Sequence, residues 1–193
     1  SPVQEGDLLD LQTLDNFIPW LNRHPGRRVD VTLTPGTEPG ELVLDYIIAE
    51  NNPLVMYAQV SNTGTDTTSE YRQRLGLTHY NLTQADDIFS LDYVTADFDS
   101  VHAINVSYER PLPGLPRVRG KVFGSWNEYD ASQVGVSGSA FTGEGFSVGG
   151  ELAWNFFQRK NLFVDAIGGL RFQNVSVNNK IAVVEGDTSF LFP

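Results

Sequence analysis

The sequence predicts a mainly β protein, an antiparallel meander of strands preceded by part of a small α+β domain. Two observations carry this prediction. Apolar residues recur with a helical period only near the N-terminus, and from Leu54 onward they alternate with polar residues in short runs separated by turns. We therefore expect two regions, an α+β part over 1–52 and an all-β part over 53–193.

The first region is expected to hold one helix and two strands. Apolar residues at steps of three and four predict a helix over 8–23 with Asp7 as its N-cap, and His24-Pro25-Gly26 ends it. Alternation then predicts strands near 28–34 and 41–50, on either side of a Pro-Gly turn. A unit this small cannot hold a core by itself, so it reads as the end of a larger domain.

The second region contains about seven alternating runs between Leu54 and Gln173, followed by a short apolar stub at the C-terminal end. Connections at 62–69, 97–101 and 129–142 look long, and those at 81–86, 111–116 and 158–161 look short. Long loops at one end and short turns at the other are typical of outer-membrane β-barrels. We expect meander order, with one shared convex face. That face should carry Leu75, Leu91, Val106, Val122, Leu152 and Val164.

Composition excludes several classes of protein. There is no cysteine, which excludes disulfide frameworks and thiol chemistry, and the net charge of −11 argues against a nucleic-acid partner. No run of 18 apolar residues predicts a transmembrane helix, but barrel strands give only a weak hydropathy signal. A soluble all-β binding module alternates in the same way. The membrane barrel is favoured because the polar face carries mainly small residues and isolated charges, and because aromatics gather at strand ends.

No constellation of residues predicts catalysis, so we expect no enzyme, no cofactor and no metal site. The three histidines are scattered, no nucleophile elbow occurs, and the Asp86-Asp87 and Asp97-Phe98-Asp99 pairs suit turns better than calcium. The charged residues on the polar side of the runs are instead candidates for the lining of a pore lumen. They are Arg72, Arg74, Asp92, Glu109, Arg119, Lys121, Glu151, Asp165 and Arg171.

Two blocks resemble a known family. Leu21-Asn22-Arg23-His24-Pro25-Gly26-Arg27-Arg28-Val29 and Pro35-Gly36-Thr37-Glu38-Pro39-Gly40 are similar to the end of the second POTRA domain of two-partner secretion transporters, the TpsB family of haemolysin secretion and activation proteins. The similarity continues more weakly through Ser61-Asn62-Thr63-Gly64, Tyr80-Asn81-Leu82 and Asp92-Tyr93. Val118-Arg119-Gly120 also looks like the arginine motif of the family's sixth extracellular loop, but it directly follows a short turn, so we read that likeness as chance.

The resemblance implies a barrel with two POTRA domains, in the bacterial outer membrane, with the N-terminal part in the periplasm. It implies export of an unfolded exoprotein partner without ATP, contact with outer-membrane lipid, and no nucleic acid. A barrel that inserts other membrane proteins is the alternative within the same superfamily. The small sheet's edge, at Val29, Val31 and Leu33, is the candidate for capturing extended cargo. Seven strands cannot close a barrel of the implied size, so we expect the molecule to continue past Pro193 or to borrow strands.

Overall fold

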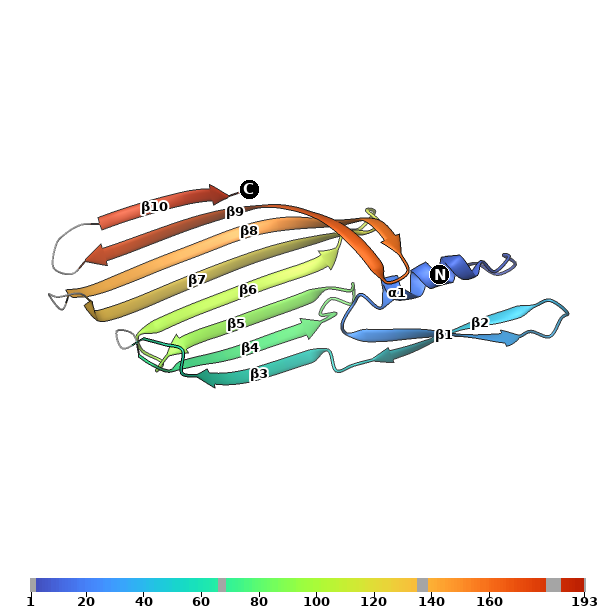
Figure 1. Ribbon diagram of the computed structural model, residues 1–193, viewed down its shortest axis with the longest axis horizontal. Helices are drawn as coiled ribbons and strands as arrows, with labels where there is room; N and C mark the ends of the chain where they lie inside the picture. Colours follow the sequence, from blue (N-terminus) through green and yellow to red (C-terminus); the bar gives the residue numbers. More distant parts are fainter. Residues whose placement is uncertain (1–2, 66–68, 135–138, 180–184, 193) are drawn as a thin grey trace. The chain divides into compact units, whose positions relative to one another are not determined.

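The computed structural model describes residues 3–65, 69–134, 139–179 and 185–192. The chain forms two compact units: Ser1–Pro53 together with Trp154–Ala166, and Leu54–Ala153 together with Ile167–Pro193 (Figure 1). The first unit therefore includes a hairpin, Trp154–Ala166, that comes from the β region of the sequence.

The first unit contains the helix α1 (Leu11–Leu21) and the strands β1 (Arg27–Pro35) and β2 (Leu42–Glu50). The two strands pair antiparallel, with Val29 opposite Ile48. The helix is shorter than the predicted 8–23, and its N-cap is Asp10 rather than Asp7. Asp10 is the N-cap because its carboxylate accepts hydrogen bonds from the Gln12 amide at 2.9 Å and from the Thr13 hydroxyl at 2.7 Å.

The small core of this unit lies between α1 and β1. Leu14 and Val29 are 6% and 2% exposed, and the Phe17 and Tyr46 rings meet edge to face at 6.3 Å. Asn22, just past the helix, donates to the Val29 carbonyl at 2.9 Å and accepts from the Val29 amide at 2.6 Å. These two bonds fasten the helix end to the strand.

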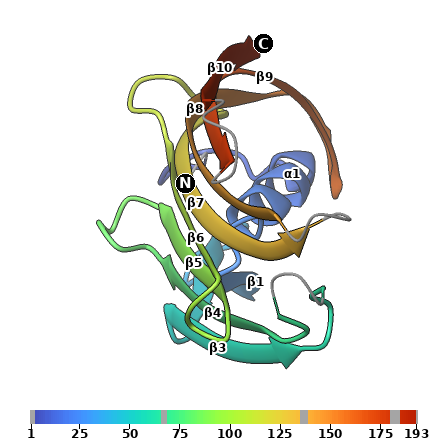
Figure 2. The ribbon, with the colours of Figure 1, turned by 90° about the vertical axis from the view of Figure 1, so that its left-hand side faces the viewer.

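The second unit is built on an eight-stranded antiparallel sheet in meander order (Figure 1). Its strands are β3 (Leu54–Ser61), β4 (Arg72–Tyr80), β5 (Ile88–Ala96), β6 (Val101–Pro111), β7 (Val118–Val134), β8 (Ser139–Arg159), β9 (Leu162–Asn179) and β10 (Glu185–Phe192). The end-on view shows the sheet curving (Figure 2). The predicted mainly β fold and its meander order are confirmed, and the expected C-terminal stub is a full strand paired with β9.

The strands differ strongly in length. β3 has 8 residues, whereas β7 and β8 have 17 and 21. The prediction of a loop over 129–142 was therefore wrong, because most of that segment belongs to β7 and β8. Its Ser, Gly and Thr residues resemble turn composition, but the backbone continues the ladder; 135–138 lie outside the described residues.

The register places five of the six predicted apolar residues on one face. Leu77, Leu91 and Val106 follow one another across β4, β5 and β6, which puts Leu75 on the same face. Val122 joins them opposite Tyr108, and Leu152 approaches Gly120 from β8. These predicted residues are between 38% and 59% exposed, and Val164, in the hairpin of the first unit, is 37% exposed. Large apolar side chains therefore cover this face without any protein packed upon them.

The turn between β4 and β5 shows why Asp86-Asp87 is turn chemistry. The Thr83 amide donates to both Asp87 carboxylate oxygens, at 3.0 and 3.2 Å, and Asn81 and Asp86 adopt the left-handed region. Burial opposes the ionisation of Asp87, but the hydrogen bonds from Thr83 outweigh it, so the pKa of Asp87 lies below the ordinary carboxyl value.

Within the part of the chain that the structure describes, no helix has both the length and the apolar character needed to cross a membrane.

Candidate functional site: the polar face of the sheet

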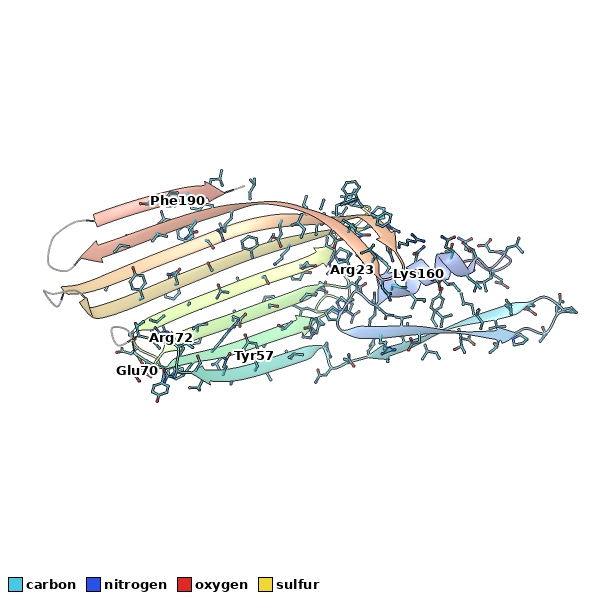
Figure 3. All side chains as sticks on the ribbon, in the orientation of Figure 1. Arg23, Tyr57, Glu70, Arg72, Lys160 and Phe190 are labelled. Carbon is cyan, nitrogen blue, oxygen red and sulfur yellow. The ribbon has the colours of Figure 1, made fainter. Side chains whose placement is uncertain are left out.

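A three-membered cluster spans β3, β4 and β5 on the polar face. The Arg74 guanidinium lies 3.0 Å from the Asp92 carboxylate, and the Tyr57 hydroxyl donates to the same carboxylate. Gly76 makes this possible, because a Cβ there would lie 2.1 Å from the Tyr57 ring. The ring crosses the bare glycine backbone to reach Asp92, an aromatic cover over a strand glycine. Figure 3 labels Tyr57 on β3.

The next strands carry two more ion pairs on the same face. Arg119 donates to the Glu109 carboxylate and, from its other nitrogen, to the Asp86 carbonyl at 2.9 Å. Lys121 lies 3.3 Å from Glu151. Six of the predicted lumenal residues therefore come together as three pairs of opposite charge on adjacent strands. All three pairs are partly exposed, so each stabilises the fold only modestly.

Small hydroxyl residues fill the spaces between these pairs. Ser125 and Ser147 share a hydrogen bond at 2.7 Å, and Thr78 and Ser90 share one at 3.3 Å. A surface of hydroxyls and paired charges is readily hydrated. It also carries the Phe123 ring, which lies opposite Ser107 and has the Lys121 ammonium 5.9 Å from its centre.

The remaining predicted lumenal residues lie apart from these pairs. Arg72 donates to the Ser69 carbonyl at 2.8 Å and so orders the backbone ahead of β4 (Figure 3). Arg171 lies in β9 opposite Phe192. Asp165 belongs to the first unit, where it meets a residue that sequence reasoning did not select.

That residue is Arg23, which forms the best-defined ion pair of the chain. Its two terminal nitrogens donate to the two Asp165 oxygens at 2.6 and 3.2 Å, and its guanidinium lies 4.7 Å from the Phe163 ring centre. Buried Asn155 donates to the same carboxylate at 2.7 Å. Arg23 was visible in the Leu21–Val29 block, but nothing local points to a partner 142 residues away.

The β8–β9 hairpin makes further contacts with α1 inside this unit. The Lys160 ammonium lies 3.1 Å from Asp15, its backbone amide donates to the Asn16 side chain at 2.8 Å, and Gln158 donates to the Asn16 carbonyl at 2.6 Å (Figure 3). One hairpin of the sheet is thus bonded to the helix through side chains and backbone together.

At the candidate capture edge of β1, part of the backbone is already hydrogen-bonded. The backbone amide and carbonyl of Val29 already form hydrogen bonds with the Asn22 side chain, on the side of β1 away from β2. Val31 and Leu33 share the strand parity of Val29, so their backbone groups point to the same side. The edge proposed from sequence is therefore reduced to its second half, at Val31 and Leu33.

Metal chemistry finds no support in the described ranges, where no group of three or more His, Cys, Asp or Glu residues could hold an ion. His102 accepts or donates a hydrogen bond with the Tyr93 hydroxyl at 2.7 Å and stacks on its ring, which is a packing role.

In sequence, the chain is similar to outer membrane transporters named CdiB. No family model matches. The chain is 28% identical over 92 residues to the outer membrane transporter CdiB-2 of Burkholderia pseudomallei (strain 1026b), which covers 48% of this chain and 16% of that protein. It is 27% identical over 81 residues to CdiB of Dickeya dadantii (strain 3937), covering 42% and 14%. The chain thus spans about a sixth of these curated relatives.

Solved structures share the fold over nearly the whole chain. CdiB from Escherichia coli matches with a TM-score of 0.75 at 16% identity, over 97% of this chain and 36% of that one. CdiB from Acinetobacter baumannii gives 0.64 at 19% identity, over 98% and 40%. BamA from Haemophilus ducreyi lacking POTRA domains 1-3 gives 0.61 at 14%, over 98% and 38%. The fold is that of part of an outer-membrane barrel, and the sequence is similar to transporters of the TpsB type.

Proposed function

We propose that this chain is part of an outer-membrane pore that exports an unfolded partner exoprotein by two-partner secretion, without ATP and without any catalytic role. The first unit belongs in the periplasm and the sheet in the outer membrane. The resemblance of the Leu21–Val29 block and the likeness to CdiB transporters in sequence and fold support this assignment.

One observation carries the proposal: the sheet segregates its two faces through consecutive strands. One face exposes Leu75, Val106, Val122 and Leu152, and the other holds the ion pairs and hydroxyls. Leaving that apolar face in water would cost ~25 cal/mol for each Å². A lipid bilayer removes this cost, and the polar face then lines an aqueous passage.

The polar face suits a cargo that passes without folding. The pairs Arg74–Asp92, Arg119–Glu109 and Lys121–Glu151 bring opposite charges together on neighbouring strands, so this part of the wall presents little net charge to attract a segment of the cargo. Val31 and Leu33 of β1 would receive extended cargo by strand addition before it enters the pore.

The test uses the gene in its natural context, with a photoreactive amino acid in place of Asn105 on the polar face of β6 or Val106 on the apolar face. Deleting the gene should remove one large protein from the culture medium. The position-105 variant should crosslink to that protein during export, and the position-106 variant should not. Equal crosslinking from both faces, or an unchanged medium, contradicts the pore.

The BamA likeness supports a second candidate, a barrel that inserts other outer-membrane proteins. The same deletion separates the two. Loss of an assembly barrel lowers the amount of many outer-membrane proteins at once, whereas loss of an export pore removes one secreted protein and leaves the others at their normal level.

A further inference from the structure

The apolar face of the sheet is not evenly covered. A hollow of about 700 Å³ lies over β6 to β9, with a lining that is almost wholly apolar. It exists because glycines stand at 150 and 168, where the positions two residues on carry Leu152 and Leu170. Gly120 also lines the groove, with Leu112 packed beside it. The missing side chains leave a groove between the large residues that remain.

Two cationic residues, Arg110 and Lys121, are among those that line this hollow. Arg110 lies in β6 opposite Gly120, and its neighbour on the same face, Tyr108, lies opposite Val122. Arg110 is thus on the apolar face, whereas Arg119 and Lys121 of the adjacent strand lie on the polar face and are paired. Its Nε is shielded from solvent and has no hydrogen-bond partner among the residues described.

Arg110 is also placed near a strand end. β6 ends at Pro111, and the short turn to β7 follows. An arginine at such a position reaches the level of lipid headgroups, while a strand centre would keep it in hydrocarbon. The charged end of the groove therefore lies where phosphates are found.

We propose that this hollow binds an anionic phospholipid of the membrane, with its phosphate on Arg110 and an acyl chain against Gly120, Gly150 and Gly168. The chemistry fits both ends. A guanidinium forms charge-assisted hydrogen bonds with phosphate oxygens, and hydrocarbon fills a groove lined by aliphatic side chains. The negative headgroup also balances a cation that the described part of the protein leaves without a counter-charge. This inference rests on the membrane placement proposed above.

Lipid binding is measured by native mass spectrometry on the full-length protein, purified from outer membranes in detergent and then titrated with lipid. Phosphatidylglycerol is compared with phosphatidylcholine of the same acyl chains, and glycerol phosphate tests the headgroup alone. The unmodified protein should retain phosphatidylglycerol preferentially. Equal retention of the two lipids, or equal binding of glycerol phosphate, overturns the proposal.

Two variants separate the charge from the groove. Arg110→Gln should weaken phosphatidylglycerol binding roughly tenfold and phosphatidylcholine binding much less, because the choline cation already neutralises the phosphate of that lipid. Gly168→Leu should weaken both lipids; a Cβ there meets nothing within 4 Å, so the larger side chain is accommodated. Arg159→Gln, at an exposed strand-end arginine of β8, is the matched control and should bind as the unmodified protein does.

Folding and placement are checked first, by the shift in electrophoretic mobility that a folded barrel shows on heating and by recovery in the outer-membrane fraction. A protein absent from that fraction contradicts the proposed function itself. A protein that is folded there but binds lipid identically before and after Arg110→Gln contradicts only the lipid site.

Discussion

The two compact units hold their charges and their apolar residues in different ways. In the first, Arg23, Asn155 and Asp165 converge, and Val29 is shielded almost completely. In the second, charges pair one to one across adjacent strands, and Val106 is 40% exposed. The first unit is stabilised as a water-soluble domain is, by burial and multiple hydrogen bonds. The second depends mostly on its backbone ladder and on what covers its apolar face.

The largest effect should come from Asp165→Ala. It removes the carboxylate partner of Arg23 and one of the three acceptors of the Asn155 amide, so we expect unfolding of the first unit to become easier by about 2 kcal/mol. Urea unfolding followed by the fluorescence of Trp20, which lies 6.4 Å from Phe163, measures it. Asp30→Ala, at an exposed pair with Arg28, is the control and should change little.

Val29→Ala compared with Val106→Ala tests the contrast between the two regions directly. Truncating buried Val29 removes core contacts and should cost about 1–2 kcal/mol. Truncating Val106 should lower the stability much less in detergent, because detergent chains fill the space that the side chain leaves. Urea midpoints of the two variants give the comparison, and similar losses at both sites would show that both regions are packed alike.

Gly76→Val should cost about 1 kcal/mol, because its Cβ displaces the Tyr57 ring from Asp92. Gly168→Val, at a strand glycine with open space around it, is the matched control. The thermal midpoint of each variant measures the difference. A loss at Gly168 as large as at Gly76 would indicate that strand glycine matters for backbone reasons alone.

The smallest effect is a pH dependence at the β4–β5 turn. The pKa of Asp87 is lowered in the folded protein, so its contribution to stability is complete above the unfolded value of 3.8 and declines as the pH falls through the folded value. Asp87→Asn should flatten the stability profile in that acid range. Hydrogen exchange of the Thr83 amide reports the change locally.

Alternation was enough to predict that Arg74 and Asp92 share a face, since a period of two leaves only two sides. It could not predict that Tyr57 crosses Gly76, which depends on the pairing register. The Arg23–Asp165 contact was beyond reach for a different reason. Its partners are 142 positions apart, and no local pattern encodes which hairpin will meet a helix.

The predictions of the helix start and of a loop in place of the long strands were wrong because the local composition was ambiguous. Asp7 and Asp10 are equivalent as sequence signals, and only the hydrogen bonds to Gln12 and Thr13 distinguish them. The Ser, Gly and Thr residues after Tyr129 suggested a loop, because small polar residues there interrupt the alternation that indicates a strand. The lumenal and capture residues remain predictions: the structure gives their partners, and the crosslinking experiment tests their role.

The length of β7 and β8 has a consequence for whatever meets the molecule from outside. A strand crosses a bilayer in roughly 9–11 residues, so a strand of 17 or 21 residues continues well past it. In the placement proposed above, an antibody or a bacteriophage that reaches the end of the sheet where β7 and β8 extend would meet hydrogen-bonded strands. Substitutions that evade recognition there would have to respect the ladder, which narrows the variation open to the protein at this surface.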